Sequence, residues 1–477
     1  MKRIITLLAF LPLYALHAAG ETKPLSNIIF VLFDDMGYAQ PKCYREGTEF
    51  KTPNLDRFAQ ESMRFTDAHS AASVCTPTRY GLLTGRYPSR IGQYGVLTTY
   101  SPPIIPKSRL TVASLLKQNG YDTACIGKWH LGMDWDGKPG NEKTLPVGSH
   151  LLTSPNAAGF DYFCGFTHAR NIGTVIEQDK VVANVEEVEN QPLLAKKTVD
   201  FLSDPARKEK PFFLYLPLCP PHTPVAPAPE FIGKSGIVGK DGQYGDWIYQ
   251  GDHMLGQVLE ALDRNKLADN TLILVSADNG AAGRPYAPLR AAKTSIYEGG
   301  HRVPFLARWP GKIKAGSVCD DTICLNDLMA TCAEIVGVKL PDNAGEDSVS
   351  ILSNLNGTAK APVREATIHQ SYKNDLAIRQ GPWKLIFLNN GKRELYNLQT
   401  DLGEATDVAQ ANPEVVNRLT TLMQKYIDDG RSTNGAPQKN EAAMSVGMSS
   451  AGKKKKGGKQ RPNSDKAKAN AKDANFD

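Results

Sequence analysis

Short apolar segments alternate with amphipathic ones along most of the chain, and this alternation limits the possible folds more than any other feature of the sequence. Residues 27 to 33 (NIIFVLF) are apolar and β-branched, which predicts a buried strand. Similar segments lie at residues 123 to 126, 212 to 218 and 271 to 275. Helical patterns lie between them, at residues 111 to 119 and on the face made by Met254, Leu255, Val258, Leu259 and Leu262. We therefore expect an α/β domain in which a sheet lies between helices.

The elements become shorter beyond about residue 357. Apolar segments at residues 376 to 378, 383 to 388 and 394 to 397 precede a helical pattern at residues 415 to 427, which predicts a small antiparallel sheet with one packed helix. From about Ser432 onward Gly, Ser, Asn, Ala and Lys dominate, as in disordered segments. We expect a large α/β domain at residues 21–356, a small C-terminal α+β domain at residues 357–431 and a disordered Lys-rich tail at residues 432–477.

The formal net charge of +6 comes from the end of the chain. The last 27 residues hold nine Lys and Arg residues against three Asp residues, so residues 1 to 450 carry equal numbers of basic and acidic side chains. A nucleic-acid-binding protein usually spreads positive charge over one face of its folded domain. We therefore expect no nucleic-acid partner, and we interpret the tail as a solvated extension.

The first twenty residues have the three parts of a secretory signal peptide. Lys2 and Arg3 precede an apolar run from Ile4 to Leu16, and small residues follow at positions 18 to 20. The alternative is a buried N-terminal helix. No later segment is long and apolar enough to cross a membrane, so we expect an exported protein in the periplasm or outside the cell.

Eight cysteines are too few for a disulfide scaffold in a chain of this length. The sequence leaves their pairing open, although Cys319 and Cys324 are the closest two.

Polar residues follow each of the four predicted strands. They are Asp34 and Asp35, Lys128 and His130, His222, and Asp278 and Asn279. In open α/β sheets ligands bind at the carboxyl ends of the strands, so we expect these side chains to converge on one site. The carboxylate and amide oxygens suit Ca²⁺ or Mg²⁺ better than zinc. Either acidic pair alone could equally be a helix cap or a turn, and two pairs at equivalent strand ends favour a metal.

The remaining groups suggest the substrate. Lys128, His130 and His222 suit an anionic ligand and proton transfer. A divalent cation beside them points to an oxyanion ester as substrate. A nucleophile could come from Cys75, because Pro77 places this cysteine at the start of a helix, where an anion is favoured, and Arg79 lies within one turn. A buried structural cysteine remains the alternative.

These residues lie within motifs that resemble those of the type I sulfatases, members of the alkaline phosphatase superfamily. The segment CTPTR at residues 75 to 79, extended by YGLLTGR, is similar to the C-x-P-x-R signature of that family. Further matches, in the family's order, are DDMG at 34 to 37, GKWHLG at 127 to 132, PPHTP at 220 to 224, ADNG at 277 to 280 and KTSIYEGGHRVP at 293 to 304. The resemblance implies an alkaline phosphatase-like fold with a mixed, mostly parallel sheet, and hydrolysis of sulfate esters.

The resemblance also implies cofactors and roles. In this family the motif cysteine is oxidised to Cα-formylglycine by a maturation enzyme, so Cys75 would become an aldehyde hydrate. One hydroxyl of the hydrate attacks sulfur, and the second then expels sulfate as the aldehyde re-forms. By the same resemblance one Ca²⁺ ion would be held by Asp34, Asp35, Asp278 and Asn279. Arg79 and Lys128 would stabilise the hydrate, His130 would accept its proton, and His222 and Lys293 would bind sulfate and protonate the leaving alcohol.

Substrate choice should depend on loops around the sulfate pocket. Candidates are residues 167 to 171 (THARN) and His301, which could bind substrate beside Lys128, His222 and Lys293. The family often has a further hydroxyl near the hydrate, and Ser149 or Thr153 could supply it, but we leave both out of the site. We expect the substrate to be a sulfated carbohydrate or another extracellular sulfate ester.

Two other functions are compatible with parts of this pattern. One is a phosphate or phosphonate ester hydrolase of the same superfamily, although Lys128 and Lys293 stand where a second metal would need Asp or His ligands. The other is a sulfated-glycan binding protein without catalysis, although binding alone needs no oxidisable cysteine.

Overall fold

A computed structural model describes residues 25–444 and 446. Its centre is a ten-stranded sheet in the order β13-β2-β12-β11-β1-β10-β4-β7-β8-β9. Four of its inner strands are those predicted from the sequence: β1 (Asn27–Asp34), β4 (Asp122–Lys128), β10 (Phe212–Pro221) and β11 (Thr271–Ala277). They run parallel to one another, as does β7 (Tyr162–Phe166) beside β4. Both faces of these inner strands are buried, which explains their continuous apolar sequences.

The outer strands make the sheet mixed. On one side β12 (Phe305–Arg308) pairs antiparallel with β11 and with β2 (Met63–Phe65), and β13 (Val318–Cys319) pairs parallel with β2. On the other side β8 (Thr174–Glu177) and β9 (Lys180–Asn184) form an antiparallel hairpin next to β7. The mixed, mostly parallel sheet expected from the sequence is confirmed.

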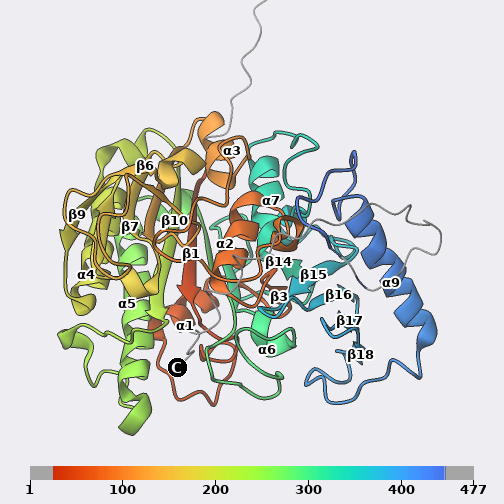
Figure 1. The fold of residues 1–477 in the computed structure, drawn as a ribbon. Helices are drawn as coiled ribbons and strands as arrows, with labels where there is room; N and C mark the ends of the chain where they lie inside the picture. Colours follow the sequence, from red (N-terminus) through yellow and green to blue (C-terminus); the bar gives the residue numbers. More distant parts are fainter. Residues whose placement is uncertain (1–24, 445, 447–477) are drawn as a thin grey trace, which may run out of the picture.

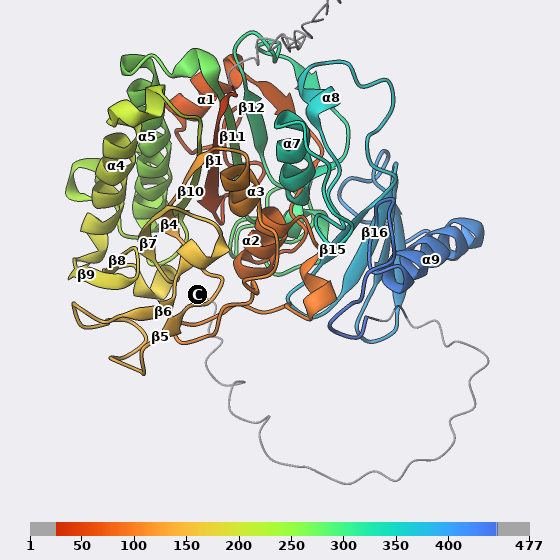
Figure 2. The same cartoon turned by 90° about the horizontal axis from the view of Figure 1, so that it is seen from above.

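Helices cover both faces of the sheet (Figures 1 and 2). Figure 2 shows α1 (Pro53–Gln60), α4 (Glu187–Ser203) and α5 (Gly242–Arg264) on one face. The opposite face carries α2 (Cys75–Thr84), α3 (Val112–Gln118) and α7 (Leu328–Ile335). The predicted helix at residues 111 to 119 is α3, and Thr111 caps it by accepting a hydrogen bond from the amide of Ser114. Shorter helical segments are α6 (Glu298–His301) and α8 (Leu352–Leu355).

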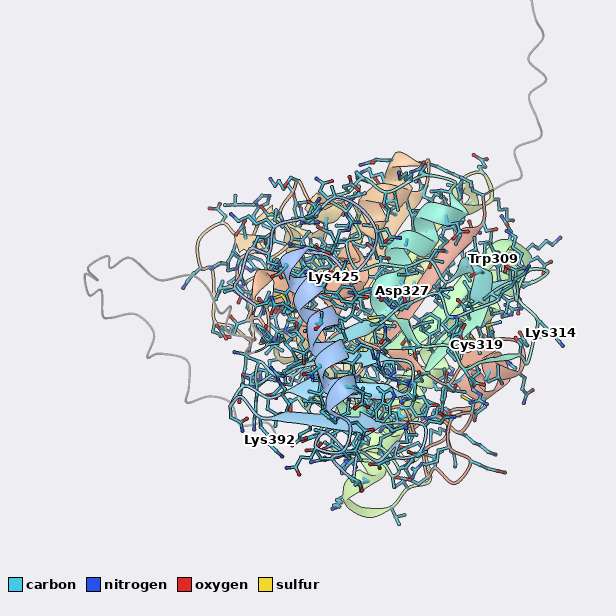
Figure 3. The ribbon with its side chains drawn as sticks, turned by 90° about the vertical axis from the view of Figure 1, so that its right-hand side faces the viewer. Trp309, Lys314, Cys319, Asp327, Lys392 and Lys425 are labelled. Carbon is cyan, nitrogen blue, oxygen red and sulfur yellow. The ribbon has the colours of Figure 1, made fainter. Side chains whose placement is uncertain are left out.

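A second, antiparallel sheet follows in the C-terminal part of the chain. It consists of β15 (Thr367–Gln370), β16 (Leu376–Gln380), β17 (Trp383–Phe387) and β18 (Arg393–Asn397). Helix α9 (Pro413–Asp428) packs its apolar face against β16 and β17, and Figure 3 shows Lys425 on this helix at the outer side of the molecule. The predicted sheet and helix are present, and β15 is an additional strand that the sequence analysis did not identify.

Strand β15 joins the small sheet to the large domain. The amide of Gln370 donates to the carbonyl of Ala71, and the amide of Ser73 donates to the carbonyl of Gln370. The pairing holds the segment immediately before Cys75. Short strands elsewhere make small additional ladders: β3 (Ala68–His69) pairs with β14 (Ile323–Cys324), and β5 (Asp134–Trp135) pairs with β6 (Leu151–Thr153).

The segment after α9 returns to the large domain. The amides of Glu441 and Ala442 both donate to the carbonyl of Arg90, and the buried guanidinium of Arg86 forms an ion pair with Glu441. These hydrogen bonds and this ion pair join segments that lie far apart in the sequence, so composition alone does not reveal them. Val446 is also buried, and its carbonyl accepts a hydrogen bond from Arg393. We therefore propose that the Lys-rich tail begins after Val446. The predicted signal peptide at residues 1 to 20 and the lysines from residue 453 onward lie outside the described residues.

Two further expectations concern cysteines and membranes. All eight cysteines are free, including Cys319 and Cys324. Within residues 25–444 and 446, no helix has the length and apolar character needed to cross a bilayer.

The packing of α9 gives a first prediction. Leu419 is fully buried between this helix and the small sheet, so Leu419→Ala should lower the free energy of unfolding by about 2–5 kcal/mol through lost burial and a residual cavity. Thr421→Ala, on the exposed side of the same helix, should change it by less than about 0.5 kcal/mol. Chemical denaturation of both variants measures the difference, and equal values would contradict the packing described here.

Candidate active site

The carboxyl ends of four neighbouring strands meet at one site. Asp34 is the last residue of β1 and Lys128 the last of β4, while His222 directly follows β10 and Asp278 directly follows β11. The strands are adjacent and parallel, so their ends lie at the same edge of the sheet. The convergence expected from the sequence is therefore present in the structure.

Three carboxylates form the centre of the site. Oxygen atoms of Asp34, Asp35 and Asp278 lie within 4.8 Å of one another, and all three residues are buried. The amide of Asp35 donates to Oδ1 of Asp278 at 3.0 Å, and Nδ2 of Asn279 donates to Oδ1 of Asp35 at 2.7 Å. Asp35 has a positive φ of 66°, which turns the chain sharply after β1. This turn brings both consecutive aspartates to the strand end.

Three cations face these carboxylates. Nη2 of Arg79 lies 2.7 Å from Asp278, Nζ of Lys128 lies 2.5 Å from Asp34, and Nζ of Lys293 lies 2.7 Å from Asp35. All six groups are nearly or completely inaccessible to solvent. Buried charges of this kind are stable only when each has a partner of opposite sign.

The two carboxylates nearest Arg79 differ in their acidity. Burial alone raises the pKa of Asp34, but Lys128, His222 and Arg79 outweigh it and hold this pKa well below its usual value. For Asp278, burial and the neighbouring charge of Asp34 raise the pKa to about 7. A divalent cation bound here would relieve the repulsion between Asp278 and the neighbouring negative charges.

The oxygen atoms available for a metal are also visible. Oδ1 of Asp34 and Oδ1 of Asn279 are buried and accept no hydrogen bond from the described residues. Together with Asp35 and Asp278 they offer only hard oxygen ligands, which fits Ca²⁺ or Mg²⁺. The four residues predicted as metal ligands therefore lie together in a chemically suitable arrangement.

Cys75 is the first residue of α2 and is almost completely buried. Potential ligand atoms of Cys75, Asp34 and His222 lie within 4.8 Å of one another, so the cysteine faces the carboxylate cluster. Burial raises the pKa of its thiol although Lys128 and Lys293 oppose this effect. An unmodified Cys75 is therefore a thiol at neutral pH and a weak nucleophile.

His130 has one ring nitrogen free to accept a proton. Nε2 lies 3.0 Å from the carbonyl oxygen of Leu97, so this nitrogen must carry the hydrogen, and Nδ1 is buried without a partner in the described part of the chain. Burial, with the positive charge of Lys128, holds the pKa of His130 well below its usual value. His130 is thus a neutral imidazole with Nδ1 as its basic atom.

His222 shows the opposite arrangement. Its Nδ1 contacts the carbonyl oxygen of Thr223, which leaves Nε2 facing Oδ2 of Asp35 at 3.7 Å. Burial and the charge of Lys293 lower the pKa of His222 to about 4. The indole of Trp247 donates to the carbonyl oxygen of His222 at 2.9 Å and fixes this turn.

Of the residues considered for specificity, His301 does not reach this cluster. It is fully buried, and its ring contacts His69, Ile296, Lys384 and the face of His369. The expectation that His301 binds substrate is therefore replaced by a structural role. The sequence alone does not reveal this role, because the partners of His301 come from distant parts of the chain.

The loop at residues 167 to 171 does border the site. The rings of His168 and His130 lie 5.7 Å apart, and Thr99 contacts Nε2 of His168 at 3.0 Å. Burial lowers the pKa of His168 to about 3, with a contribution from Lys128. Ser149, by contrast, is half-buried and donates to the carbonyl of Pro146, and Thr153 lies in β6.

Comparison with known proteins agrees with this geometry. A profile of the sulfatase family matches residues 26–338, and a profile for the C-terminal part of N-sulphoglucosamine sulphohydrolase matches residues 291–431. An N-acetylgalactosamine-6-O-sulfatase of Bacteroides thetaiotaomicron is 30% identical over 89% of this chain and 99% of its own length. The chain belongs to the sulfatase family. Human arylsulfatase A is 32% identical, covering 86% of this chain and 89% of its own.

Solved sulfatase structures resemble the fold as well. The crystal structure of Ps i-CgsB in complex with a neocarrahexaose has a TM-score of 0.75 and 29% identity, covering 87% of this chain and 96% of the other. A B. thetaiotaomicron protein from a glycosaminoglycan-metabolism locus has the same TM-score at 28% identity, over 84% of this chain and 99% of its own. The protein is therefore a sulfuric ester hydrolase with an alkaline phosphatase-like fold.

Gly127 gives a prediction about how this sulfatase positions Lys128. It has φ of 135°, and a Cβ atom there would lie 2.1 Å from the carbonyl oxygen of Pro217 in β10. Gly127→Ala should therefore displace the following lysine and lower kcat/KM by about tenfold to a hundredfold. Gly47→Ala, where a Cβ meets no atom within 4 Å, should leave kcat/KM unchanged. Full activity of Gly127→Ala would show that the backbone here tolerates a shift.

Proposed function

We propose that this sulfatase is exported and hydrolyses sulfate monoesters of a carbohydrate, with a formylglycine derived from Cys75 and one Ca²⁺ ion. The observation that carries the proposal is the position of Cys75. It lies buried at the start of α2, facing Asp34 and His222 among the charged residues at the strand ends.

The surroundings of Cys75 fit its proposed modification. A formylglycine hydrate supplies a hydroxyl that attacks sulfur and a second hydroxyl that releases sulfate. Such a group needs a nearby base and nearby positive charge, and His130, Arg79 and Lys128 supply them. Because Cys75 itself has a raised pKa, an unmodified thiol would not serve as well.

Asp34, Asp35, Asp278 and Asn279 would hold the Ca²⁺ ion. The free Oδ1 atoms of Asp34 and Asn279 and the crowded carboxylate of Asp278 support this assignment. Bound there, the ion would act as a Lewis acid that offsets negative charge on the reacting group.

The two histidines and Lys293 would move the protons. Nδ1 of His130 is the basic atom available to accept a proton from the hydrate. Asp35 raises the pKa of Lys293 against the effect of burial, so this ammonium holds its proton and can bind a sulfate oxygen. An anionic ester beside His222 would raise the low pKa of this histidine and allow its Nε2 to protonate the leaving alcohol.

The balance of charge favours sulfate over phosphate. The three cations Arg79, Lys128 and Lys293 already pair with three carboxylates, so the excess positive charge of the site would come from the one proposed Ca²⁺ ion. A sulfate monoester has one negative charge and needs less neutralisation than a phosphate dianion. A phosphonate monoester hydrolase of Agrobacterium radiobacter shares the fold at 18% identity, which leaves phosphate or phosphonate esters as the alternative substrates to test.

The relatives support a carbohydrate substrate. The B. thetaiotaomicron relative is named for N-acetylgalactosamine-6-sulfate, and the structure of Ps i-CgsB contains a neocarrahexaose. We propose a sulfated sugar as the substrate class, with the loop at residues 167 to 171 contacting the leaving group. The predicted signal peptide supports export, and the CTPTR motif supports a formylglycine-generating enzyme as a transient partner.

Matched sulfate and phosphate esters test the proposed activity. The protein, produced with a maturation enzyme, should release sulfate from a sulfated sugar or aryl sulfate at least a hundredfold faster than phosphate from the analogous phosphate ester.

Cys75→Ala should abolish turnover with an unchanged fold, and mass spectrometry of the Cys75 peptide should detect formylglycine. Cys43→Ala, at a half-buried cysteine away from the site, should remain active. Preference for the phosphate ester would refute the proposal, and an unmodified Cys75 in inactive protein would favour a binding function.

Metal removal tests the Ca²⁺ assignment. Treatment with a chelator should lower kcat by at least tenfold, and added Ca²⁺ should restore it, because the carboxylate cluster loses its compensating cation. Asp278→Ala should show the same loss without recovery in Ca²⁺. Asp269→Ala, at an exposed aspartate far from this cluster, serves as the control. A normal rate in chelator would show that the four oxygen ligands do not hold a required metal.

A further inference from the structure

The short helix α6 lies between two parts of the active site. The carbonyl of Gly300 accepts a hydrogen bond from the amide of Gly280 at 2.9 Å, and the carbonyl of His301 accepts one from the amide of Ser70 at 2.9 Å. Gly280 directly follows Asn279, and Ser70 lies in the segment that leads to Cys75. Helix α6 thus connects the proposed metal-binding loop to the segment that carries the proposed nucleophile.

Helix α6 is also connected along the polypeptide chain to the segment that carries Lys293. Lys293 lies five residues before the helix, and the amide of Thr294 donates to the carbonyl of Ser73 at 2.8 Å. Close packing leaves this region little room to move, since a Cβ atom on Gly280 would lie only 1.8 Å from the carbonyl oxygen of Gly299. A displacement of α6 would therefore be transmitted to the catalytic residues.

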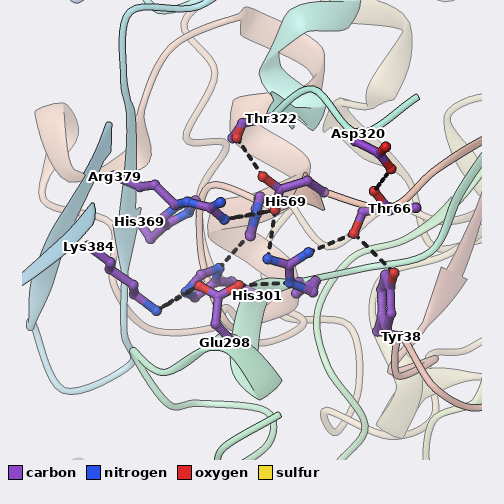
Figure 4. A network of polar contacts seen from close by, with 12 residues as sticks. Tyr38, Thr66, His69, Glu298, His301, Asp320, Thr322, His369, Arg379 and Lys384 are labelled. Carbon is purple, nitrogen blue, oxygen red and sulfur yellow. Dashed lines mark hydrogen bonds and ion pairs between the residues drawn. The ribbon is translucent and has the colours of Figure 1, made fainter. Parts of the chain in front are cut away.

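Lys384, from β17 of the C-terminal sheet, holds the side chains of α6 (Figure 4). Its Nζ lies 3.0 Å from Oε1 of Glu298, 3.0 Å from Nε2 of His301 and 2.8 Å from Oε1 of Glu404. The side chains of Lys384, Glu298, His301 and Glu404 are fully buried. Burial raises the pKa of Glu298, but Lys384 and Arg302 outweigh it, so this carboxylate is ionised.

The hydrogen bonds continue from α6 toward β3. Nε2 of His301 lies 3.0 Å from Nζ of Lys384 and 3.1 Å from the carbonyl oxygen of Ile296, and Nδ1 of His301 lies 3.1 Å from Nδ1 of His69. Nε2 of His69 donates to Asp67 at 2.8 Å. Burial lowers the pKa of both histidines, which agrees with two neutral rings. Lys384 is therefore linked through His301 and His69 to the carboxylate of Asp67.

The three histidines in this region do not form a metal site in the observed arrangement. The rings of His301 and His369 stack face to face, with centroids 4.0 Å apart and planes inclined by 8°. A metal ion must lie close to the plane of each ligating ring, so it could not bind both rings at once. Lys384 and Arg379 would in addition repel a cation at His301 and His69.

We propose that Lys384 is a positioning residue of the active site: acting through Glu298 and His301, it fixes α6 and thereby the segments that carry Cys75, Lys293 and Asn279. The inference rests on the catalytic roles proposed for those residues. It assigns to the C-terminal sheet a part in catalysis that is separate from contact with the substrate.

Lys384→Met tests the proposal, because methionine nearly keeps the length of the side chain and removes its positive charge and its hydrogen-bond donors. We expect kcat/KM for the sulfate ester to fall by about tenfold to a hundredfold at pH 8, as for other small displacements of catalytic groups. Hydrogen exchange at the amides of Ser70 and Gly280 should become faster, since both donate to α6.

The pH dependence separates positioning from a general loss of stability. The charged or titratable groups next to His301 are His69, Glu298, His369 and Lys384. Behind them lie Asp67, Arg302, Arg379 and Glu404, which contact His69, Glu298 or Lys384. Without Lys384, His301 no longer faces a positive charge, and the neighbouring carboxylate of Glu298 has lost one of its cationic partners. Both changes raise the pKa of His301. His301 should then take up a proton at a higher pH than in the wild-type protein and replace part of the missing charge. The ratio of variant to wild-type kcat/KM should therefore increase toward low pH.

Arg364→Met is the matched control. Arg364 is also buried where the small sheet meets the large domain, and it pairs with Asp327 at 3.1 Å, while none of its hydrogen bonds in the described residues reaches α6. It should lower stability but give a kcat/KM ratio that does not vary with pH, and normal exchange at Ser70 and Gly280.

If Lys384→Met does not fold, the double variant Lys384→Met/Glu404→Gln takes its place. It removes one buried charge of each sign and should give the same changes in kcat/KM and in amide exchange. A pH-independent ratio equal to that of Arg364→Met, or unchanged amide exchange in either Lys384 variant, would overturn the proposal. If the wild-type protein released no sulfate, the proposed function would fail, while the exchange measurement would still decide whether Lys384 fixes these segments.

Discussion

Three carboxylates and three cations are buried together at the carboxyl ends of the central strands, and the arrangement of the active site depends on their mutual compensation. Asp34, Asp35 and Asp278 face Lys128, Lys293 and Arg79 at distances of 2.5 to 2.7 Å. Moving any one of these charges out of contact would leave its partner buried and unpaired, at a cost of about 3–5 kcal/mol. The parallel strands provide the rigid frame that opposes such movement, because each is hydrogen-bonded to its neighbours in the sheet.

Much of this frame could be predicted from the sequence, because it depends on local patterns. Buried parallel strands have continuous apolar sequences, and polar residues at their ends mark a site wherever the fold brings those ends together. The directions of hydrogen bonds could not be predicted in this way. The proton on Nε2 of His130 is assigned by the carbonyl of Leu97, and a backbone carbonyl has no signature in the sequence. The buried position of His301 could not be predicted for the same reason, since its partners His69 and Lys384 come from other parts of the chain.

The C-terminal sheet completes the large domain in two places. Strand β15 pairs with the segment before Cys75, and Lys384 of β17 supplies the cation between Glu298 and Glu404. A boundary drawn from composition near residue 357 separates two patterns of secondary structure. It does not separate two sets of interactions, because the buried Glu298 of α6 pairs with Lys384 across that boundary as well as with Arg302. The small sheet is thus better regarded as a second layer of support for the active site.

Backbone strain shows where this support is needed. Asp35, His130 and Thr294 all have positive φ angles, of 66°, 57° and 77°, which non-glycine residues seldom adopt, and a β-branched residue such as Thr294 least of all. Each such conformation costs about 1–3 kcal/mol and persists only where surrounding contacts enforce it. The first two residues lie at strand ends within the rigid sheet. Thr294 does not, and it follows Lys293 in a loop whose amide and carbonyl groups bond to Ser73 and Tyr372. The least regular part of the catalytic centre is therefore the part held between the C-terminal sheet and the segment before Cys75, and the cation of Lys384 stabilises the helix that follows it.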